Sequence, residues 1–234
     1  MALIKFGGGV VSMSGSIAGT TFARNRYGSY ARARTKPVNP NSTRQVQARS
    51  IMAQLAEQWG ETPLTDLIRE AWRTYADAIT VNNRLGEAIN LSGFNHFIRS
   101  NAAILTCGGT MVTAGPTTLS LPATDPTIAI TGSEASNELE VTFDDDLEWL
   151  DENGGHLSIE MGQPKKSSIN FFAGPWRFAD SVDGDDTTPP TTPATIDAPF
   201  TLIEDQKVWA RAKIIRADGR ISNAFNVEPF IVAA

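Results

Sequence analysis

Arginine and aromatic side chains alternate with small residues near the start of the chain, a pattern that could bind anionic groups. From Phe22 to Lys36, the even positions outside the central turn are aromatic or basic, and the odd positions are mostly small. Arginine forms paired hydrogen bonds with carboxylates or phosphates, and aromatic rings stack on bases. We predict that a partner is bound by Phe22, Arg24, Arg26, Tyr27, Tyr30, Arg32, Arg34 and Lys36.

This alternation has the period of a β-strand, whose successive side chains point to opposite faces. It predicts one face rich in arginine and aromatic residues and another face of small residues. Asn25-Arg26-Tyr27-Gly28 predicts a hairpin turn, with Gly28 at a positive φ. We call residues 1–41, which contain this hairpin, the arm. Because a two-stranded hairpin is marginally stable alone, the arm is expected to be held by a neighbouring subunit, another protein or a nucleic acid. The alternative is a flexible basic tail.

Charge is distributed unevenly along the chain. Residues 1–50 hold eight basic residues and no acidic one, so residues 51–234 hold the other twelve basic residues and all twenty-six acidic ones. A cationic arm on an anionic body is typical of an interaction tail. The acidic body would repel nucleic acid, so nucleic acid is a possible partner that we do not favour. Residues 105–234, with eight basic and twenty acidic residues, offer carboxylates instead, which favours homo-oligomeric or other protein contacts.

Residue types that could support catalysis are few. His96, His156 and Cys107 lie in no recognisable catalytic or metal-binding constellation, and we predict structural or surface roles for them. Two acidic clusters could in principle bind calcium, but neither matches an EF-hand, and solvated loops are the favoured interpretation. The clusters are Asp144-Asp145-Asp146 with Glu148, and Asp180 with Asp183, Asp185 and Asp186. We therefore predict no enzyme activity, no cofactor, no metal and no small-molecule substrate.

Length and hydropathy limit the class of protein further. A chain of 234 residues can form one large or two modest domains. No apolar run approaches the ~18 residues of a membrane span, and the start lacks the apolar core of a signal peptide. We expect a protein made in the cytoplasm and used there or carried in a particle assembled there.

The arm is expected to span residues 1–41 and a helical domain residues 42–106. Residues 1–20 are rich in glycine and serine and indicate loop or extended chain, and Pro37 and Pro40 end the arm. Ser42 caps a helix over 43–59, Thr65 caps a second helix, and Ser92 caps a third, with a polar connection over 80–91 between the last two. Their predicted apolar stripes include Val46, Met52, Leu55, Trp59, Leu64, Leu67, Ile68, Trp72, Tyr75, Ile79, Phe94, Phe97, Ile98 and Leu105.

Residues 107–126 are a linker rich in glycine, threonine and proline, and residues 127–234 alternate with a period of two. About seven short strands between turn signals favour an antiparallel β-sandwich. The predicted fold class is therefore α+β and multidomain, with an extended arm, a small helical segment and a sandwich of the fibronectin III or immunoglobulin type.

Residues 127–234 resemble fibronectin type III domains. Val208-x-Ala210-x-Ala212-x-Ile214, followed by Gly219 and Ser222, is spaced like the late strand and turn of that family. Leu139-x-Val141-x-Phe143 lies where the family has an early L-x-V-x-W strand. Phenylalanine replaces the usual tryptophan, valine the usual tyrosine, and residues 183–193 form an inserted loop. The resemblance implies an adhesive or structural module.

Residues 15–72 are similar to uncharacterised proteins encoded by bacteriophages and prophages. The shared residues are Gly15, Gly19, Phe22, Arg24-Asn25-Arg26, Gly28, Tyr30, Arg32, Arg34, Pro37, Asn39-Pro40, Gln45, Arg49 and Glu70-Ala71-Trp72. The resemblance implies a phage context. Within that context we expect a non-enzymatic virion structural protein made in the host cytoplasm, with capsid decoration or cementing as the first expectation and tail or neck as the alternative. A packaging-associated nucleic-acid-binding protein is a further alternative. A weaker one is a carbohydrate-binding adhesin that uses Trp149, Trp176 or Trp209.

Overall fold

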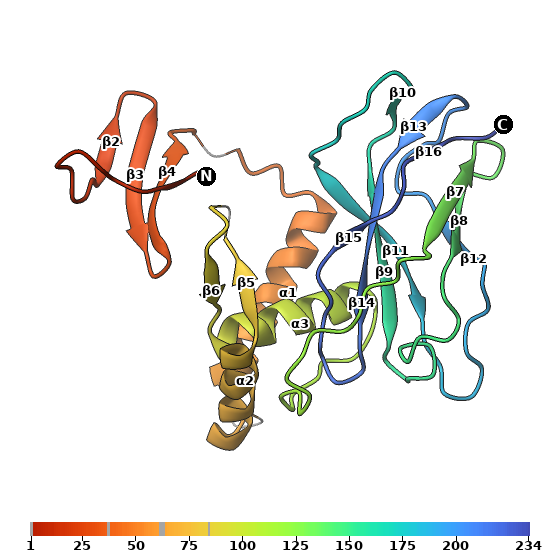
Figure 1. Cartoon of the computed structure of the whole chain (residues 1–234), viewed down its shortest axis with the longest axis horizontal. Coiled ribbons are helices and arrows are strands. Elements are labelled where there is room, and N and C mark those ends of the chain that lie inside the picture. The colour runs from red at the N-terminus through yellow and green to blue at the C-terminus, as the bar shows by residue number, and fades with distance from the viewer. Residues whose placement is uncertain (1, 37, 61–63, 84) are drawn as a thin grey trace.

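A computed structural model describes residues 2–36, 38–60, 64–83 and 85–234, which form three helices and several antiparallel sheets (Figure 1). The N-terminal sheet occupies the upper left of this view, the helices lie below it, and the β-rich part lies on the right. None of the helices in the described ranges is both long enough and apolar enough to cross a lipid bilayer.

The arm forms a four-stranded sheet of its own. Its strands are β1 (Ala2–Ile4), β2 (Gly15–Ile17), β3 (Thr20–Asn25) and β4 (Gly28–Ala33), in the order β1-β4-β3-β2. Residues 1–20 were expected to be loop or extended chain, and the loop interpretation is wrong for β1 and β2, which cover the two edges of the β3–β4 hairpin. No described residue from 2 to 36 is buried, so the sheet lacks a core.

The helical segment contains α1 (Thr43–Gly60), α2 (Asp66–Ala78) and α3 (Gly93–Thr106). The predicted caps are confirmed, because the side chains of Ser42, Thr65 and Ser92 each accept a hydrogen bond from the backbone N–H three residues later. The expected polar connection instead contains a hairpin of β5 (Thr80–Asn82) and β6 (Ala88–Asn90). The core of this segment holds Leu55, Leu64, Trp72, Tyr75, Ile79, Phe97 and Ile98.

Some predicted stripe positions are not buried. Leu67 is 81% exposed on α2, and Val46 and Met52 are about half exposed on α1. Helical spacing alone does not determine how wide a face neighbouring elements cover, and α1 buries only Leu55 completely.

The remainder is β-rich, as predicted. A three-stranded sheet has the order β12-β8-β7, and a four-stranded sheet has the order β11-β9-β14-β15. A smaller sheet of three short strands has the order β10-β13-β16. The strands are β7 (Ala129–Ser133), β8 (Glu138–Thr142), β9 (His156–Gly162), β10 (Lys165–Lys166), β11 (Trp176–Asp183), β12 (Ala194–Asp197), β13 (Gln206–Val208), β14 (Ala210–Ile215), β15 (Phe225–Asn226) and β16 (Phe230–Ile231). One apolar cluster draws side chains from both larger sheets, including Ile130, Leu139, Val141, Leu157, Ile159, Ile196, Ala212 and Ile214.

The helices and the β-rich part pack against each other. Ile104 of α3, Ile215 of β14 and Ile221 form one buried cluster. Residues 107–126 contain no helix or strand, but they are held in place. Asn101 contributes to this by bonding both the backbone N–H and the carbonyl of Val112. Strand β9 is buried on both faces, whereas a sandwich sheet usually has one face in water.

Candidate partner-binding surface

The β3–β4 turn forms as the sequence predicted. Asn25 pairs with Gly28 across a two-residue loop, and Gly28 has a φ of 122°. The side chain of Asn25 accepts a hydrogen bond from the N–H of Tyr27 at 2.9 Å, which holds the loop. The eight predicted partner-binding residues are therefore displayed as follows: Phe22 and Arg24 on β3, Arg26 and Tyr27 in the turn, Tyr30 and Arg32 on β4, and Arg34 and Lys36 after β4.

The predicted single face of arginine and aromatic residues is wrong. Directly opposite residues share a face, and Phe22 lies opposite Ala31 while Tyr30 lies opposite Ala23. Phe22 and Arg24 therefore share one face, and Tyr30 and Arg32 occupy the other. The aromatic and basic residues occupy even positions on both strands, but the register pairs each even residue of β3 with an odd residue of β4. Even positions of the two strands therefore lie on opposite faces.

The basic side chains on this sheet have no partner within the described residues. Arg24, Arg26, Arg32, Arg34 and Lys36 are exposed, and none of these side chains forms a hydrogen bond or an ion pair there. In contrast, Tyr27 is anchored to the body, because its hydroxyl accepts a hydrogen bond from the side-chain amide of Asn95 at 2.7 Å. Arg24 and Arg32 lie on opposite faces of the sheet, and Arg26, Arg34 and Lys36 lie in its turn and after its last strand. These five free cations are suited to binding anionic groups.

A second contact between arm and body joins Lys5 to Glu87, just before β6. Hydrogen bonds from Lys5 and Asn83, with the positive charge of Lys5, lower the pKa of Glu87. Both partners remain substantially exposed, so salt will screen the pair. The arm is therefore attached to the body at its turn and near its start, while its arginines stay free.

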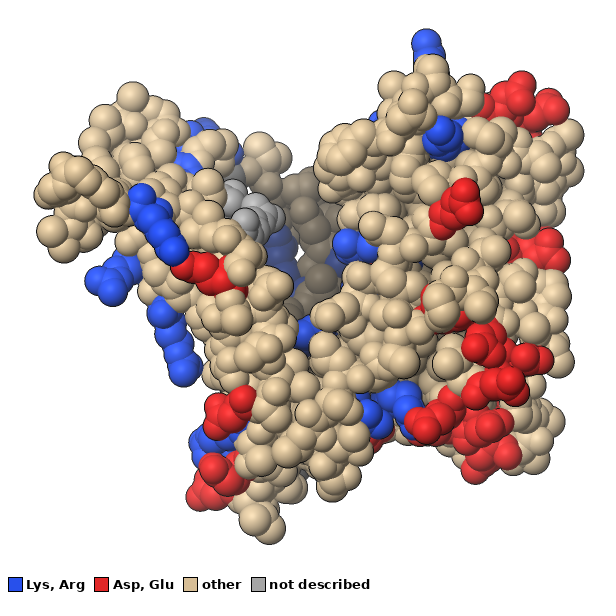
Figure 2. All heavy atoms as spheres, in the orientation of Figure 1, with Lys and Arg blue, Asp and Glu red and all other residues tan. Residues whose placement is uncertain are grey.

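Acidic side chains gather on the opposite part of the molecule. In Figure 2, basic side chains project from the N-terminal sheet, whereas most of the acidic ones cluster over the β-rich part. This agrees with the eight basic and twenty acidic residues of the range 105–234. The two surfaces are complementary in charge and do not meet within the described chain.

His156, Asp183 and Ser181 come together in a way that the sequence analysis missed. His156 Nδ1 lies 2.6 Å from Asp183 Oδ1, and Ser181 Oγ donates to the same oxygen at 2.8 Å. In a catalytic triad the hydroxyl would lie at Nε2. In this structure His156 Nε2 is buried and has no hydrogen-bond partner among the described residues, and a Cβ added at Gly109 would lie 2.7 Å from it. The arrangement therefore lacks the geometry of nucleophilic catalysis.

Of the other two candidate reactive groups, His96 is buried and Cys107 is partly buried. Burial raises the pKa of the Cys107 thiol to about 11, so little thiolate forms near neutral pH. Burial and the nearby charge of Arg99 lower the pKa of His96 to about 4, so this ring is neutral at pH 7. Among the described residues, no group of three or more histidine, cysteine or acidic side chains is arranged to hold a metal ion.

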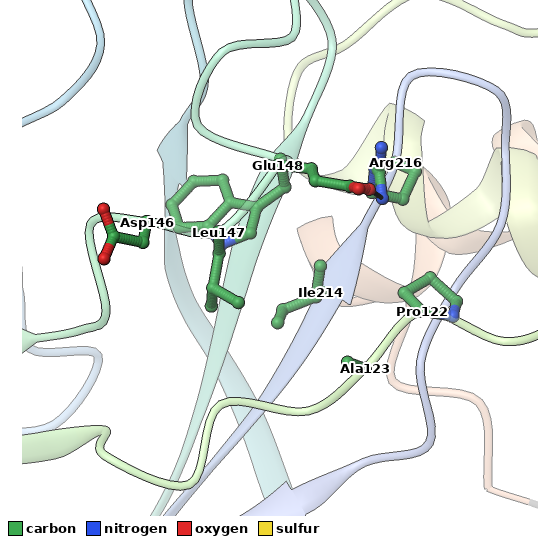
Figure 3. A pocket seen from close by; sticks show the side chains of 8 residues that line it. Pro122, Ala123, Asp146, Leu147, Glu148, Ile214 and Arg216 are labelled. Atoms are coloured by element: carbon green, nitrogen blue, oxygen red, sulfur yellow. Dashed lines mark hydrogen bonds and ion pairs between the residues drawn. The ribbon is translucent and has the colours of Figure 1, made fainter.

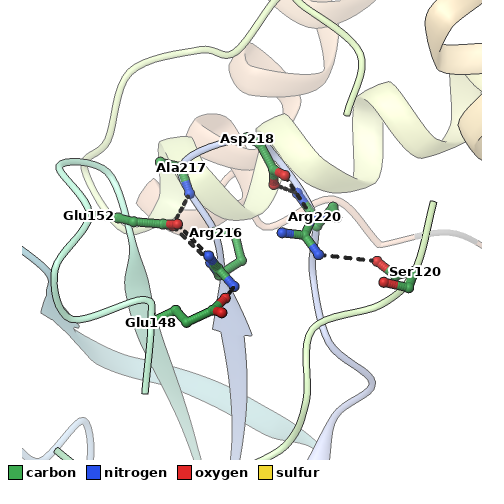
Figure 4. A network of polar contacts seen from close by, with 7 residues as sticks. All are labelled: Ser120, Glu148, Glu152, Arg216, Ala217, Asp218 and Arg220. Atoms are coloured by element: carbon green, nitrogen blue, oxygen red, sulfur yellow. Dashed lines mark hydrogen bonds and ion pairs between the residues drawn. The ribbon is translucent and has the colours of Figure 1, made fainter. Parts of the chain in front are cut away.

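A cavity of about 280 Å³ lies beside Trp149 and is lined by Leu147, Glu148, Ile214 and Arg216 among others (Figure 3). Its basic group is already neutralised, because Arg216 forms ion pairs with Glu148 and Glu152 (Figure 4). The network also includes the N–H of Ala217, which donates to Glu152 at 3.1 Å. Arg216 thus joins the loop after β8 to the end of β14, and we assign this cluster to stability.

Two of the three tryptophans proposed for sugar stacking are unsuitable. Trp149 is 1% exposed and Trp209 is 8% exposed, so neither ring face is open to a ligand. Trp176 is partly exposed but already packs edge-on against Phe172 and lies under the guanidinium of Arg211. These contacts weaken the adhesin alternative.

Comparisons of the chain with family models, with curated proteins and with solved structures find no match. A function is therefore inferred from two features of the structure. One is the set of five unpaired basic side chains of the arm, and the other is the arrangement of the β-rich part.

Proposed function

We propose that this chain is a non-enzymatic structural protein of a bacteriophage particle, in which the basic arm binds neighbouring protein subunits. The observation that carries the proposal is the set of five basic side chains that have no partner within the described residues of their own chain. A sheet without a buried residue gains stability when a second surface covers it. Arginines that are desolvated in this way pair best with carboxylates.

The arrangement of the β-rich part supports a fibronectin-like module as the outward domain. If β7, β8, β9, β12, β14 and β15 are lettered A, B, C, E, F and G, the larger sheets read A-B-E and C-F-G, with β11 beside C. Sandwiches of the immunoglobulin and fibronectin type divide their strands in a closely similar way. Val208, Ala210, Ala212 and Ile214, the residues that carry the resemblance, are all buried. A rigid module of this kind suits capsid decoration, and tail or neck placement is the alternative.

Nucleic-acid binding is the second candidate, because the same free arginines could contact phosphates. The acidic β-rich part opposes it. If protein contacts are the function, purified protein should bind DNA no tighter than the ~10⁻⁴–10⁻⁶ M range of non-specific binding at physiological salt. Submicromolar binding that disappears when Arg24, Arg26, Arg32 and Arg34 become alanine would favour packaging instead.

The test of the virion proposal is a mass-spectrometric protein list of particles purified from a host that carries the gene. We expect this chain in stoichiometric amount, and particles that lack it would refute the proposal. A variant with Arg24, Arg32 and Arg34 changed to lysine keeps the charge and loses the planar guanidinium groups. It should enter particles less efficiently than wild type. Lys165 and Lys166 on β10 changed together to arginine provide a matched control that should enter normally.

A further inference from the structure

A second cavity, of about 630 Å³, lies beside the β5–β6 hairpin, and none of its described lining residues belongs to the arm. It is formed by β5, by Leu91 just before α3, by α3 itself, and by the segment before β15, which is distant from the others in sequence. The lining residues are Thr80, Val81, Asn82, Leu91, Arg99 and Asn223. The sequence analysis missed this cavity because residues 80–91 were expected to be a polar connection.

One wall of the cavity is an open strand edge. Within the described residues, β5 pairs only with β6, in a sheet of two strands. The N–H of Asn83 donates to the carbonyl of Glu87, which places the hydrogen-bonding groups of Val81 on the β6 side. By the alternation of an antiparallel ladder, Thr80 and Asn82 direct their backbone groups toward the open edge. An edge of this kind is a template for another extended chain.

The other notable group is a guanidinium without a counter-ion. Arg99 is half-buried, and its side chain forms no hydrogen bond or ion pair within the described residues. The titratable groups that interact with it are Tyr75 and His96. Burial raises the pKa of Tyr75 and lowers that of His96, so both are uncharged at neutral pH. A partly desolvated cation with no anion beside it is unfavourable, and a carboxylate is the partner that matches its geometry.

We propose that this cavity binds an extended segment of a partner protein, which adds as a strand to β5 and places an aspartate or glutamate side chain on Arg99. Strand addition supplies affinity through main-chain hydrogen bonds, and the charged side chain supplies specificity. The open edge favours a peptide over a free anion, because a free anion would leave the backbone groups of Thr80 and Asn82 unpaired. This inference involves none of the arm residues and is independent of the virion proposal.

The test uses the full chain and two short probes, acetyl-Val-Thr-Glu-Thr-Val-amide and the same peptide with glutamine in place of glutamate. We expect the glutamate peptide to bind about tenfold or more tightly than the glutamine peptide in an NMR titration, because only it forms a charge-assisted pair. Binding should also slow hydrogen exchange at the amides of Thr80 and Asn82. Arg99→Met should abolish the preference between peptides. Arg73→Met, which removes a guanidinium already paired with Glu70 on α2, should leave it unchanged.

Each other outcome would overturn the proposal. Equal affinities for the two peptides, or no binding of either by the folded wild-type chain, would show that Arg99 does not select a carboxylate on a strand. Sodium acetate is the third probe, and it tests whether a free carboxylate binds without a peptide. If acetate binds Arg99 as tightly as the glutamate peptide and the amides of Thr80 and Asn82 stay unprotected, the cavity is a site for small anions and the strand is absent.

Discussion

Substitution of Ile104 by alanine should destabilise the helices and the β-rich part together. Ile104 belongs to α3 and is 2% exposed, yet it packs against Ile215 of β14 and Ile221. The same junction is closed by Trp72, since a Cβ added at Gly219 would lie 3.2 Å from its ring. We therefore expect the helical segment and the β-rich part to unfold as one cooperative unit, although the sequence indicated separate domains at 42–106 and 127–234.

The size of the effect follows from the burial of Ile104. Truncation of a fully buried isoleucine to alanine costs about 2–5 kcal/mol, because hydrophobic contacts are lost and a cavity remains. For a chain of this length, each kcal/mol lowers the melting temperature by about 2–4 °C, so a decrease of roughly 4–20 °C is expected. The alanine itself favours helix, which slightly offsets the loss.

The assay is thermal unfolding followed by NMR at amides in two places, α3 and β9. Both sets of signals should disappear at the same, lowered temperature in Ile104→Ala. Leu67→Ala is the control, because that side chain is 81% exposed on α2 and its loss should change stability by no more than about 0.5 kcal/mol. A lowered midpoint at α3 with an unchanged midpoint at β9 would show that the two parts fold independently.

Three further predictions concern the arm and the buried titratable groups. Deletion of residues 1–36 keeps the hydrogen bonds of Arg49 to Asn39 and Asn41 and should leave the melting temperature of the body almost unchanged, because the arm adds no buried residue. A large decrease in scanning calorimetry would show that the arm is part of the fold. Cys107 should react with Ellman's reagent at pH 8 at least about a hundredfold more slowly in the folded protein than in denaturant, since burial raises the pKa of its thiol from 9.0 to about 11. Rapid stoichiometric labelling of the native chain would contradict this. In the folded protein His96 has a pKa of about 4, below its ordinary 6.5, so its contribution to stability is complete above pH 6.5 and is lost as the pH falls toward 4. The melting temperature should therefore decrease less over this pH range in His96→Gln than in wild type. Identical slopes of melting temperature against pH in the two proteins would refute the assignment.

Local signals in the sequence predicted much of the fold. The caps at Ser42, Thr65 and Ser92 were identified because each side chain bonds a backbone group only three residues away. Most of the strand predicted over 208–214 is present as β14 (Ala210–Ile215), whose buried side chains alternate up to Ile214. Val208 belongs instead to β13, in another sheet, which the alternation did not predict. The turn at Gly28 was also a local signal, which needed only a residue that tolerates a positive φ.

Features that depend on distant partners were missed. The two faces of the arm sheet depend on the register across the turn, where one residue of shift moves Tyr30 to the opposite side from Phe22. Burial of His156 depends on Gly109, which is 47 residues earlier in the numbering. The environment of Arg99 was also missed, because no pattern in the sequence shows that a cation lacks a carboxylate nearby. The free arginines of the arm were predicted as a set, but their distribution on both faces was not.

The most direct test of the assembly proposal is an electron cryo-microscopy structure of the particle or oligomer that contains this chain. We predict that the guanidinium groups of Arg24, Arg32 and Arg34 lie within hydrogen-bond distance of carboxylates on another polypeptide chain. The two faces of the arm sheet should both be covered by such neighbours, because arginines occupy both. Guanidinium groups of Arg24, Arg32 and Arg34 that contact no other polypeptide chain, or that contact nucleic-acid phosphates instead of protein carboxylates, would contradict the proposal.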